Sequence, residues 1–358
     1  MSNDFQYRNS DLVVLNDRVI SLAVRDNGNN KNASLIFCDN IRVAERVIYT
    51  SYKRVIEDFQ AVGENSNIRV VWRERDNRLF NESDFHYAEI TDEGILTEHH
   101  VLQCNEVNFK HAALMRAKIL NVGYLLLAVI SEVTKKMILT VYDTNNYSQL
   151  ASALSLDDAV NTKYLRSQKI ANANVVLLSV DKNNVYMQFL LTSGTLRNYG
   201  VSINEATGEV QARKLFDFAL DNIGYHNCLI DKEKELIMIT YSGLDWKNNN
   251  IYAAKQKLFE SDSIRTAESL RVSQTSGDYF RPFVIKQNDG YLIAWEDACI
   301  HYTVIDSNLD IVKAETTQDA VCPGYILLAQ KNDIFISCQI ENLPNREFGS
   351  SFLLTKLR

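Results

Sequence analysis

The chain has 358 residues, of which 46% are hydrophobic, and a net charge of −7 at pH 7. This hydrophobic content suffices for a globular core and excludes a disordered chain. Acidic and basic residues are interspersed, which excludes the basic footprint of a nucleic-acid-binding protein. No apolar run approaches the about 20 residues that a membrane-spanning helix needs.

A polar turn that follows an apolar run recurs along the chain and marks an internal repeat. The turn residues are Asp39, Asp92, Asp143, Asn204 and Asp306, spaced 53, 51, 61 and 102 residues apart. The last spacing is two periods of 51, so the repeat predicts a degenerate copy near residue 255. Each period has room for four short strands.

Four-stranded units of about 40–50 residues in series are typical of β-propeller blades. The chain therefore resembles the β-propeller superfold over its whole length, as an all-β, seven-bladed single domain spanning 1–358. The Gly-His to Trp-Asp spacing of WD40 repeats and the Asp box of sialidases are missing, so no family within the superfold is indicated. The predicted blades are 10–50, 56–103, 110–155, 173–217, 223–271, 279–316 and 323–358 plus 3–8.

The last unit has room for three strands only, and its third is predicted at 351–356. Before the first unit lies an alternating segment that contains Phe5 and Tyr7. An open edge strand is a hazard that ring closure removes. We expect this N-terminal segment to complete the C-terminal blade and close the ring.

About ten extra residues separate the third and fourth units, at 155–163. Ser155 can cap a short helix whose first turn carries Asp157 and Asp158. The insertion is interpreted as a surface loop, or alternatively as a lip that contacts a partner.

Two repeat units share a second motif, a Trp followed by charged residues and then a His-Tyr pair. The copies are Trp72-Arg73-Glu74 with His86, and Trp295-Glu296-Asp297 with His301. Glu74 and Glu296 could serve as the acid and base of a glycoside hydrolase. Because a catalytic acid is usually unique and this motif is repeated, packing between blades is the favoured interpretation for the acids and for both histidines.

The ends of the second strands are expected to share one face of the ring, which commonly carries function in this superfold. The binding-face candidates there are Arg25, Asp26, Arg73, Glu74, Glu132, Tyr241, Trp246, Glu296, Asp297 and Glu341. No metal-ligand spacing, nucleophile elbow or phosphate-binding loop occurs, so no cofactor and no metal are predicted. His99 and His100 are adjacent on an outer strand and point to opposite faces, so they are not expected to share a metal.

The sequence favours a non-catalytic scaffold or binding protein that uses this face to bind a protein or glycan partner. The first alternative is a carbohydrate-binding or glycoside-hydrolysing propeller. The second is a structural component of a larger viral or secreted assembly. The six cysteines form no Cys-x-x-Cys and are interpreted as reduced, and no secretory signal is seen, so a cytoplasmic location is expected.

Overall fold

The protein is described here from a computed structural model. It describes residues 5–15, 18–27, 32–39, 44–52, 54–64, 66–76, 82–106, 109–121, 123–160, 175–218, 223–244, 249–258, 264–265, 269–274, 280–296, 299–318, 323–330, 334–340 and 351–356. All named elements in these ranges are β-strands, which confirms the predicted all-β class. Within the same ranges, no helix has the length and apolar character needed to cross a membrane.

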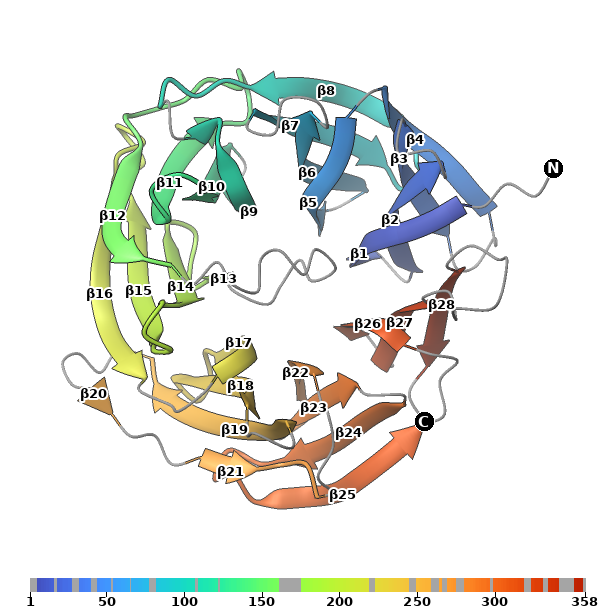
Figure 1. The fold of residues 1–358 in the computed structure, drawn as a ribbon, viewed down its shortest axis with the longest axis vertical. Helices are drawn as coiled ribbons and strands as arrows, with labels where there is room; N and C mark the ends of the chain where they lie inside the picture. Colours follow the sequence, from blue (N-terminus) through green and yellow to red (C-terminus); the bar gives the residue numbers. More distant parts are fainter. Residues whose placement is uncertain are drawn as a thin grey trace. The chain divides into compact units, whose positions relative to one another are not determined.

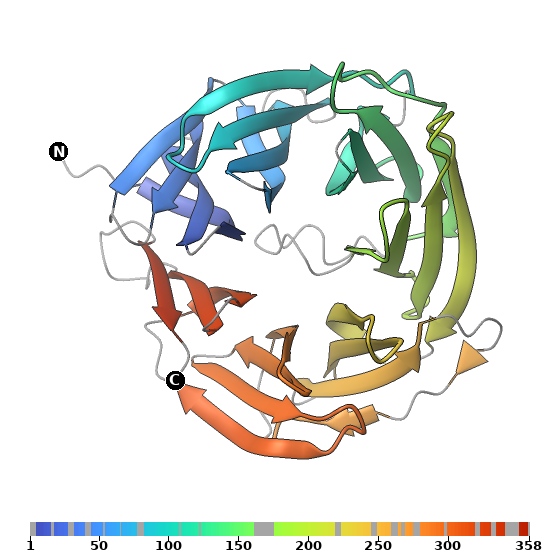
Figure 2. The ribbon, with the colours of Figure 1, turned by 180° about the vertical axis from the view of Figure 1, so that it is seen from behind.

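The described strands form seven sheets, and in five of them the neighbouring strands follow one another in the chain (Figure 1; Figure 2 shows the same order from behind). Five sheets have four strands, one has three, and one has five because β20 adds to its edge. Consecutive strands pair antiparallel, as short turns between them require. This is the serial four-stranded pattern expected from the repeat.

The chain divides into two compact units, and each is described by itself. Unit 1 comprises Met1–Asp157, Thr207–Glu209 and Leu327–Arg358, and unit 2 comprises Asp158–Ala206 and Val210–Ile326. The strands that begin in unit 1 are β1 (Phe5–Leu15), β2 (Arg18–Asn27), β3 (Asn32–Asp39), β4 (Ala44–Tyr52), β5 (Arg54–Glu64), β6 (Asn67–Asp76), β7 (Ser83–Thr91), β8 (Leu96–Leu102), β9 (Ala112–Asn121), β10 (Tyr124–Ser131), β11 (Lys136–Asp143), β12 (Leu154–Ala159), β27 (Ile334–Ile340) and β28 (Ser351–Lys356).

Unit 2 holds the three sheets that lie between these in sequence. Its strands are β13 (Val175–Ser179), β14 (Asn184–Leu190), β15 (Leu196–Ile203), β16 (Val210–Phe218), β17 (Ile223–Asp231), β18 (Leu236–Leu244), β19 (Asn249–Lys257), β20 (Ile264–Arg265), β21 (Ser269–Arg271), β22 (Phe280–Gln287), β23 (Gly290–Glu296), β24 (Ile300–Ile305), β25 (Ile311–Gln318) and the start of β26 (Pro323–Gln330). The segment β20 pairs parallel with the end of β16.

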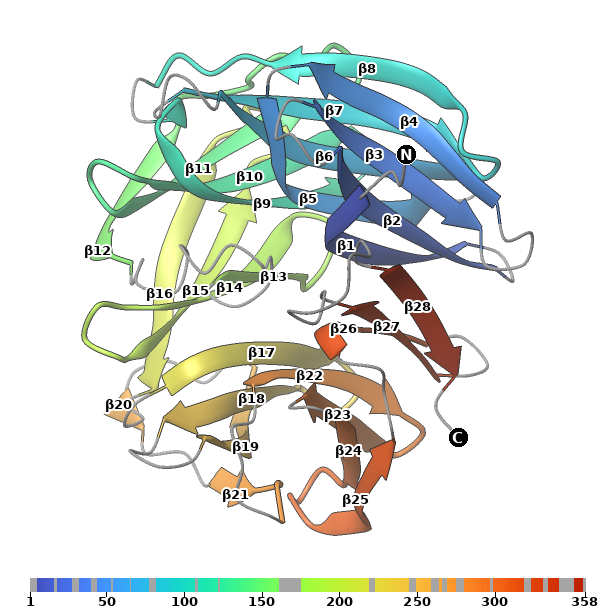
Figure 3. The same cartoon turned by 45° about the vertical axis from the view of Figure 1, so that its right-hand side comes forward.

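The prediction that the N-terminal segment completes the last sheet is wrong. Phe5 pairs with Asn27 and Tyr7 with Arg25, so the segment extends β1 along β2. The last sheet contains β26, β27 and β28 only, among the described residues. Within unit 1, β1 lies beside β27 and β28 without a shared ladder (Figure 3). The N-terminal segment stays paired with β2 because β1 continues through a bulge, seen as a register shift between Arg8 and Ser10.

The helix expected from Ser155 is also absent from its predicted place. Ser155 lies in β12, the outer strand of the third sheet, and 161–174 fall outside the described residues. Leu156 is buried while the residues on either side are exposed, so the segment alternates with the period of a strand.

Each hydrophobic core lies between two consecutive sheets. In unit 1, Val70 and Trp72 of β6 pack toward the first sheet, whereas Val71 belongs to the core shared with the third. Unit 2 repeats this arrangement around β18, where Ile239 and Met238 enter different cores. A second strand is therefore covered on both faces, which explains its near-continuous apolar sequence.

Side chains next to the bulges of two innermost strands bond to the backbone of the sheet that follows. Oδ2 of Asp11 accepts the N–H of Ala61 at 2.8 Å, and Oδ1 of Asn227 accepts the N–H of Val284 at 3.4 Å. The paired residues are 50 and 57 positions apart, close to the repeat period. These contacts give the two backbone donors an acceptor on the preceding sheet.

Three of the turn residues that marked the repeat form Asx turns. Oδ1 of Asp306 accepts the backbone N–H groups of Asn308 and Asp310 at 2.8 and 2.9 Å. Asp143 and Asn204 accept in the same way from the residue two positions on. These Asx turns connect third and fourth strands, as predicted.

Candidate functional site

The predicted binding-face residues that the structure describes lie in or directly after second strands. In unit 1, Arg73 and Glu74 lie near the end of β6, Arg25 near the end of β2, and Glu132 directly after β10. In unit 2, Tyr241 lies in β18 and the backbone of Glu296 ends β23. Trp246, Asp297, Glu341 and the side chains of Asp26 and Glu296 lie outside what the structure describes.

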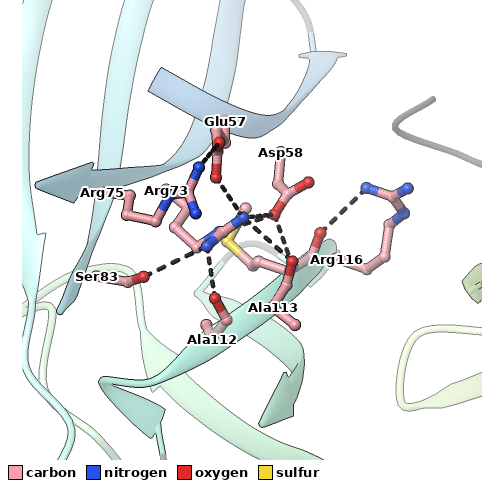
Figure 4. A network of polar contacts seen from close by, with 9 residues as sticks. Glu57, Asp58, Arg73, Arg75, Ser83, Ala112, Ala113 and Arg116 are labelled. Carbon is pink, nitrogen blue, oxygen red and sulfur yellow. Dashed lines mark hydrogen bonds and ion pairs between the residues drawn. The ribbon is translucent and has the colours of Figure 1, made fainter. Parts of the chain in front are cut away.

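Arg73 is buried in a polar network that joins the second and third sheets (Figure 4). Its Nε lies 2.8 Å from Oδ2 of Asp58, and its Nη2 lies 2.7 Å from Oε2 of Glu57. Its Nη1 donates to the carbonyl oxygen of Ala112 on β9 at 2.6 Å. Every guanidinium nitrogen therefore has a protein partner, and Arg73 is a structural cross-link.

Asp58 holds this network from an unusual backbone conformation. Its φ is +49°, at the β5 bulge between Glu57 and Gln60. The same Oδ2 that faces Arg73 also accepts the N–H of Met115 on β9 at 3.0 Å. Short polar side chains such as Asp tolerate a left-handed backbone, and here the conformation aims the carboxylate at the next sheet.

The network also determines the charge state of Arg73. Burial alone would lower the pKa of its guanidinium, but the nearby charges of Asp58 and Glu57 outweigh burial and raise the pKa above its ordinary value. Glu57 additionally pairs with Arg75, whose side chain is 27% exposed, at 2.8 Å. Arg75 is thus the member of this cluster that reaches solvent.

Glu74, a candidate catalytic acid, is buried with 3% exposure. Its Oε1 accepts the indole N–H of Trp72 at 3.2 Å, and its Oε2 accepts the hydroxyl of Ser51 at 3.0 Å. Ser51 belongs to β4, so the carboxylate links the first sheet to the second. Glu74 is in unit 1 and Glu296 in unit 2, and pairing them as acid and base stays a prediction.

The repeated Trp and His residues form the same contact in both copies. Trp72 lies opposite His86 in the β6–β7 register, with ring planes 8° apart. Trp295 lies opposite His301 in the β23–β24 register, with ring planes 7° apart. All four side chains are buried. The two copies differ in the outer strand, where His86 contacts His99 and His301 contacts Glu315.

Tyr241 is buried with 4% exposure and its ring lies 5.3 Å from that of Tyr252. Burial raises the pKa of its hydroxyl. Arg25 is half-buried on β2. Of the candidates with described side chains, Glu132 is the one that directly precedes a strongly exposed apolar residue, Val133.

Sequence reasoning missed Asp58, Glu57 and Ser51 as parts of these networks. Asp58 falls in a stretch that reads as an ordinary first strand, and its role depends on a bulge. An acidic residue within an apolar strand pattern was the signal available. No group of three or more His, Cys, Asp or Glu side chains in the described part of the chain is placed to hold a metal ion.

No protein-family model matches this chain, and no curated protein matches its sequence. Solved structures do match. The β-propeller domain of the Trilobed protease from Pyrococcus furiosus, described as having an open velcro topology, shares 9% identity over 99% of this chain and 94% of its own, with a TM-score of 0.51. The Dos1 propeller shares 11% identity over 94% of this chain and 91% of its own, with a TM-score of 0.53.

A prolyl endopeptidase structure shares 11% identity over 99% of this chain, with a TM-score of 0.54, but this chain spans only 48% of its length. At such low identity these likenesses show the fold alone. The chain has a β-propeller fold.

Proposed function

We propose that this β-propeller chain is a non-catalytic binding protein whose second-strand ends contact a protein or glycan partner. The observation that carries the proposal is the state of Glu74, because both of its oxygens accept hydrogen bonds from buried protein groups. A general acid or base needs access to the reacting proton. The best acid candidate with a described side chain is instead part of the packing.

The residues around the second-strand ends support contact with a large partner. Val133, in the turn after β10, is 68% exposed, and it follows Glu132. Arg75, near the end of β6 in the second sheet, also reaches solvent. A mixed apolar and charged surface suits a protein interface better than a deep small-molecule pocket.

The proposal is tested by capturing partners with the purified full chain from extracts of its source cells. We expect Val133→Asp to weaken capture. The matched control is Ile95→Asp, because Ile95 is 48% exposed and lies in the turn between β7 and β8, at the opposite end of its sheet. Equal capture by both variants would contradict a role for the second-strand ends.

Glycan binding and hydrolysis are measured in parallel. Binding on a glycan array that Val133→Asp weakens would identify the partner as a carbohydrate. Turnover of an aryl-glycoside panel that disappears in Glu74→Gln or Glu296→Gln would overturn the non-catalytic assignment. An empty capture experiment with a silent glycan array would overturn the binding proposal itself.

We also propose a reducing compartment for the protein. Cys104 and Cys228 are free thiols, and Cys228 is buried in an apolar core. Thiols in such positions behave as small hydrophobic residues. Alkylation of the protein purified without reductant and then unfolded should label both thiols.

A further inference from the structure

His86 on β7 and His99 on β8 form a direct contact between two imidazoles. Nδ1 of His86 lies 2.9 Å from Nε2 of His99. A hydrogen bond between two ring nitrogens needs a proton on one and a lone pair on the other. The hydrogen bond can therefore form when both rings are neutral or when one ring is charged. When both rings are charged, neither nitrogen can accept, and the hydrogen bond is lost.

The pair sits at the joint between the first and second sheets. The ring of Tyr49, on β4, lies 5.0 Å from His99 and 5.1 Å from Trp72. Nε2 of His86 lies 3.8 Å from Oε2 of Glu74, which is held by Ser51 of β4. Contacts from β4 thus reach both ends of the histidine pair.

The surrounding charges favour one proton and oppose two. Among the described residues, the titratable groups that face the pair are Glu74 on β6 and Tyr49 on β4, while His100 acts from the neighbouring position of β8. Burial lowers the pKa of His99, and His100 lowers it further, against the opposing field of Glu74.

We propose that His86 and His99 form an acid-sensitive latch within the second sheet, where it packs on β4 of the first sheet; the latch stays closed with up to one added proton and opens when a second binds. In the doubly charged state two positive rings would lie with centroids 5.2 Å apart and without a hydrogen bond. Opening hydrates both rings and frees β4 from β8. The latch goes beyond the binding role proposed above and does not depend on it.

The equivalent pair in unit 2 lacks this property. Nδ1 of His301 lies 2.9 Å from Oε1 of Glu315, so a proton on His301 strengthens that contact. The two copies share the Trp–His arrangement, but the partner of the histidine is an imidazole in unit 1 and a carboxylate in unit 2. The response is therefore a property of His99 and not of the repeat.

The size of the effect follows from proton linkage. The open state binds one proton more than the closed state below the ordinary imidazole pKa. The equilibrium constant for opening then rises about tenfold for each pH unit below about 6.5. If the contact stayed closed with both rings protonated, the equilibrium constant for opening would not rise in this way as the pH falls.

The test is amide hydrogen exchange of the full chain between pH 7.5 and 5.0, corrected for intrinsic exchange rates. We expect peptides from β4 and β8 to keep their protection down to about pH 6.5 and then to lose it by about tenfold per pH unit. His99→Gln can keep a hydrogen bond to His86 but cannot titrate, and it should abolish the slope. His100→Gln is the matched control and should retain it, because His100 points to the opposite face and its ring packs on Tyr147.

An equal slope in His99→Gln and in the unaltered chain would overturn the latch, as would a flat profile in the unaltered chain. If His99→Gln does not fold, nuclear magnetic resonance titration of the histidine rings in the unaltered chain decides the question. Two coupled steps, the second well below pH 6.5, are expected. Independent titration of both rings near their ordinary pKa would overturn the proposal.

Discussion

The indole Nε1 of Trp72 lies 3.2 Å from Oε1 of Glu74, two positions further along the same strand, and donates its hydrogen bond there. Alternate residues of a strand share a face, so the pair faces the first sheet together. The carboxylate meets the hydroxyl of Ser51 on that sheet. The motif resembles a catalytic acid beside an aromatic ring, but here it packs the second sheet against the first.

Removing this carboxylate should cost stability rather than activity. We expect Glu74→Leu to lower the free energy of unfolding by about 1–3 kcal/mol, because the buried donors of Trp72 and Ser51 lose their acceptor. Urea denaturation measures the change. The control is Glu93→Leu at an exposed turn position, where the change should stay within about 0.5 kcal/mol. Similar losses in both variants would contradict the assignment.

The two arginines of the second sheet should differ strongly in their contributions. Arg73→Met leaves the buried carboxylate of Asp58 without its main partner and removes one of the two arginines that pair with Glu57, so we expect a loss of about 3–5 kcal/mol. Arg75→Met breaks one partly exposed ion pair and should cost less than about 1 kcal/mol. Chemical denaturation of the two variants side by side gives the comparison. A result in which Arg75→Met is the more damaging would refute the cross-link.

Any side chain at Gly94, a turn position with a left-handed backbone, should lower the stability of the fold. Gly94 has a φ of +76°, and a Cβ there would lie 2.7 Å from Cγ of Phe37. We expect Gly94→Ala to lower the melting temperature, since the backbone conformation alone costs roughly 1–2 kcal/mol. Gly200→Ala serves as the control, because its Cβ would meet nothing closer than 3.5 Å. Calorimetry should show that control close to the unaltered chain.

Asp231 should make stability depend on acid. Its burial favours the neutral form, but hydrogen bonds from Tyr291 and Lys286 outweigh burial and lower its pKa below the ordinary 3.8. A carboxyl whose folded pKa is depressed stabilises the fold above its unfolded pKa, and this contribution is lost as pH falls through the folded pKa. We therefore expect the stability gap between the unaltered chain and Asp231→Asn to be constant above about pH 5 and to shrink as the pH falls below 3.8.

Urea midpoints at a series of pH values from 2.5 to 7 give this gap directly. Asp289→Asn is the control, since Asp289 is exposed in the turn before β23. A gap for Asp231→Asn that stays constant down to pH 2.5 would show that its carboxylate has no special partners.

Much of the architecture could be read from local pattern. Alternating apolar residues predict strands, and Asx turns such as that of Asp306 separate third from fourth strands. The spacing of these turns predicts serial four-stranded sheets, and the repeated Trp72 and Trp295 indicate a shared packing role. Each of these signals lies within a few residues, which is why one sequence suffices to see it.

Other features depend on contacts between residues far apart in the chain. An extended segment such as Phe5–Arg8 can add to either of two sheets, and only its continuity with β1 across a bulge selects β2. The burial of Arg73 requires Asp58 in a left-handed conformation and a carbonyl group of β9, neither of which has a local signature. The choice of His99 rather than an acid as the partner of His86 likewise emerges only when the outer strand pairs. Strand-forming tendency is a property of short stretches, whereas partner choice and burial arise from distant parts of the chain competing for the same space.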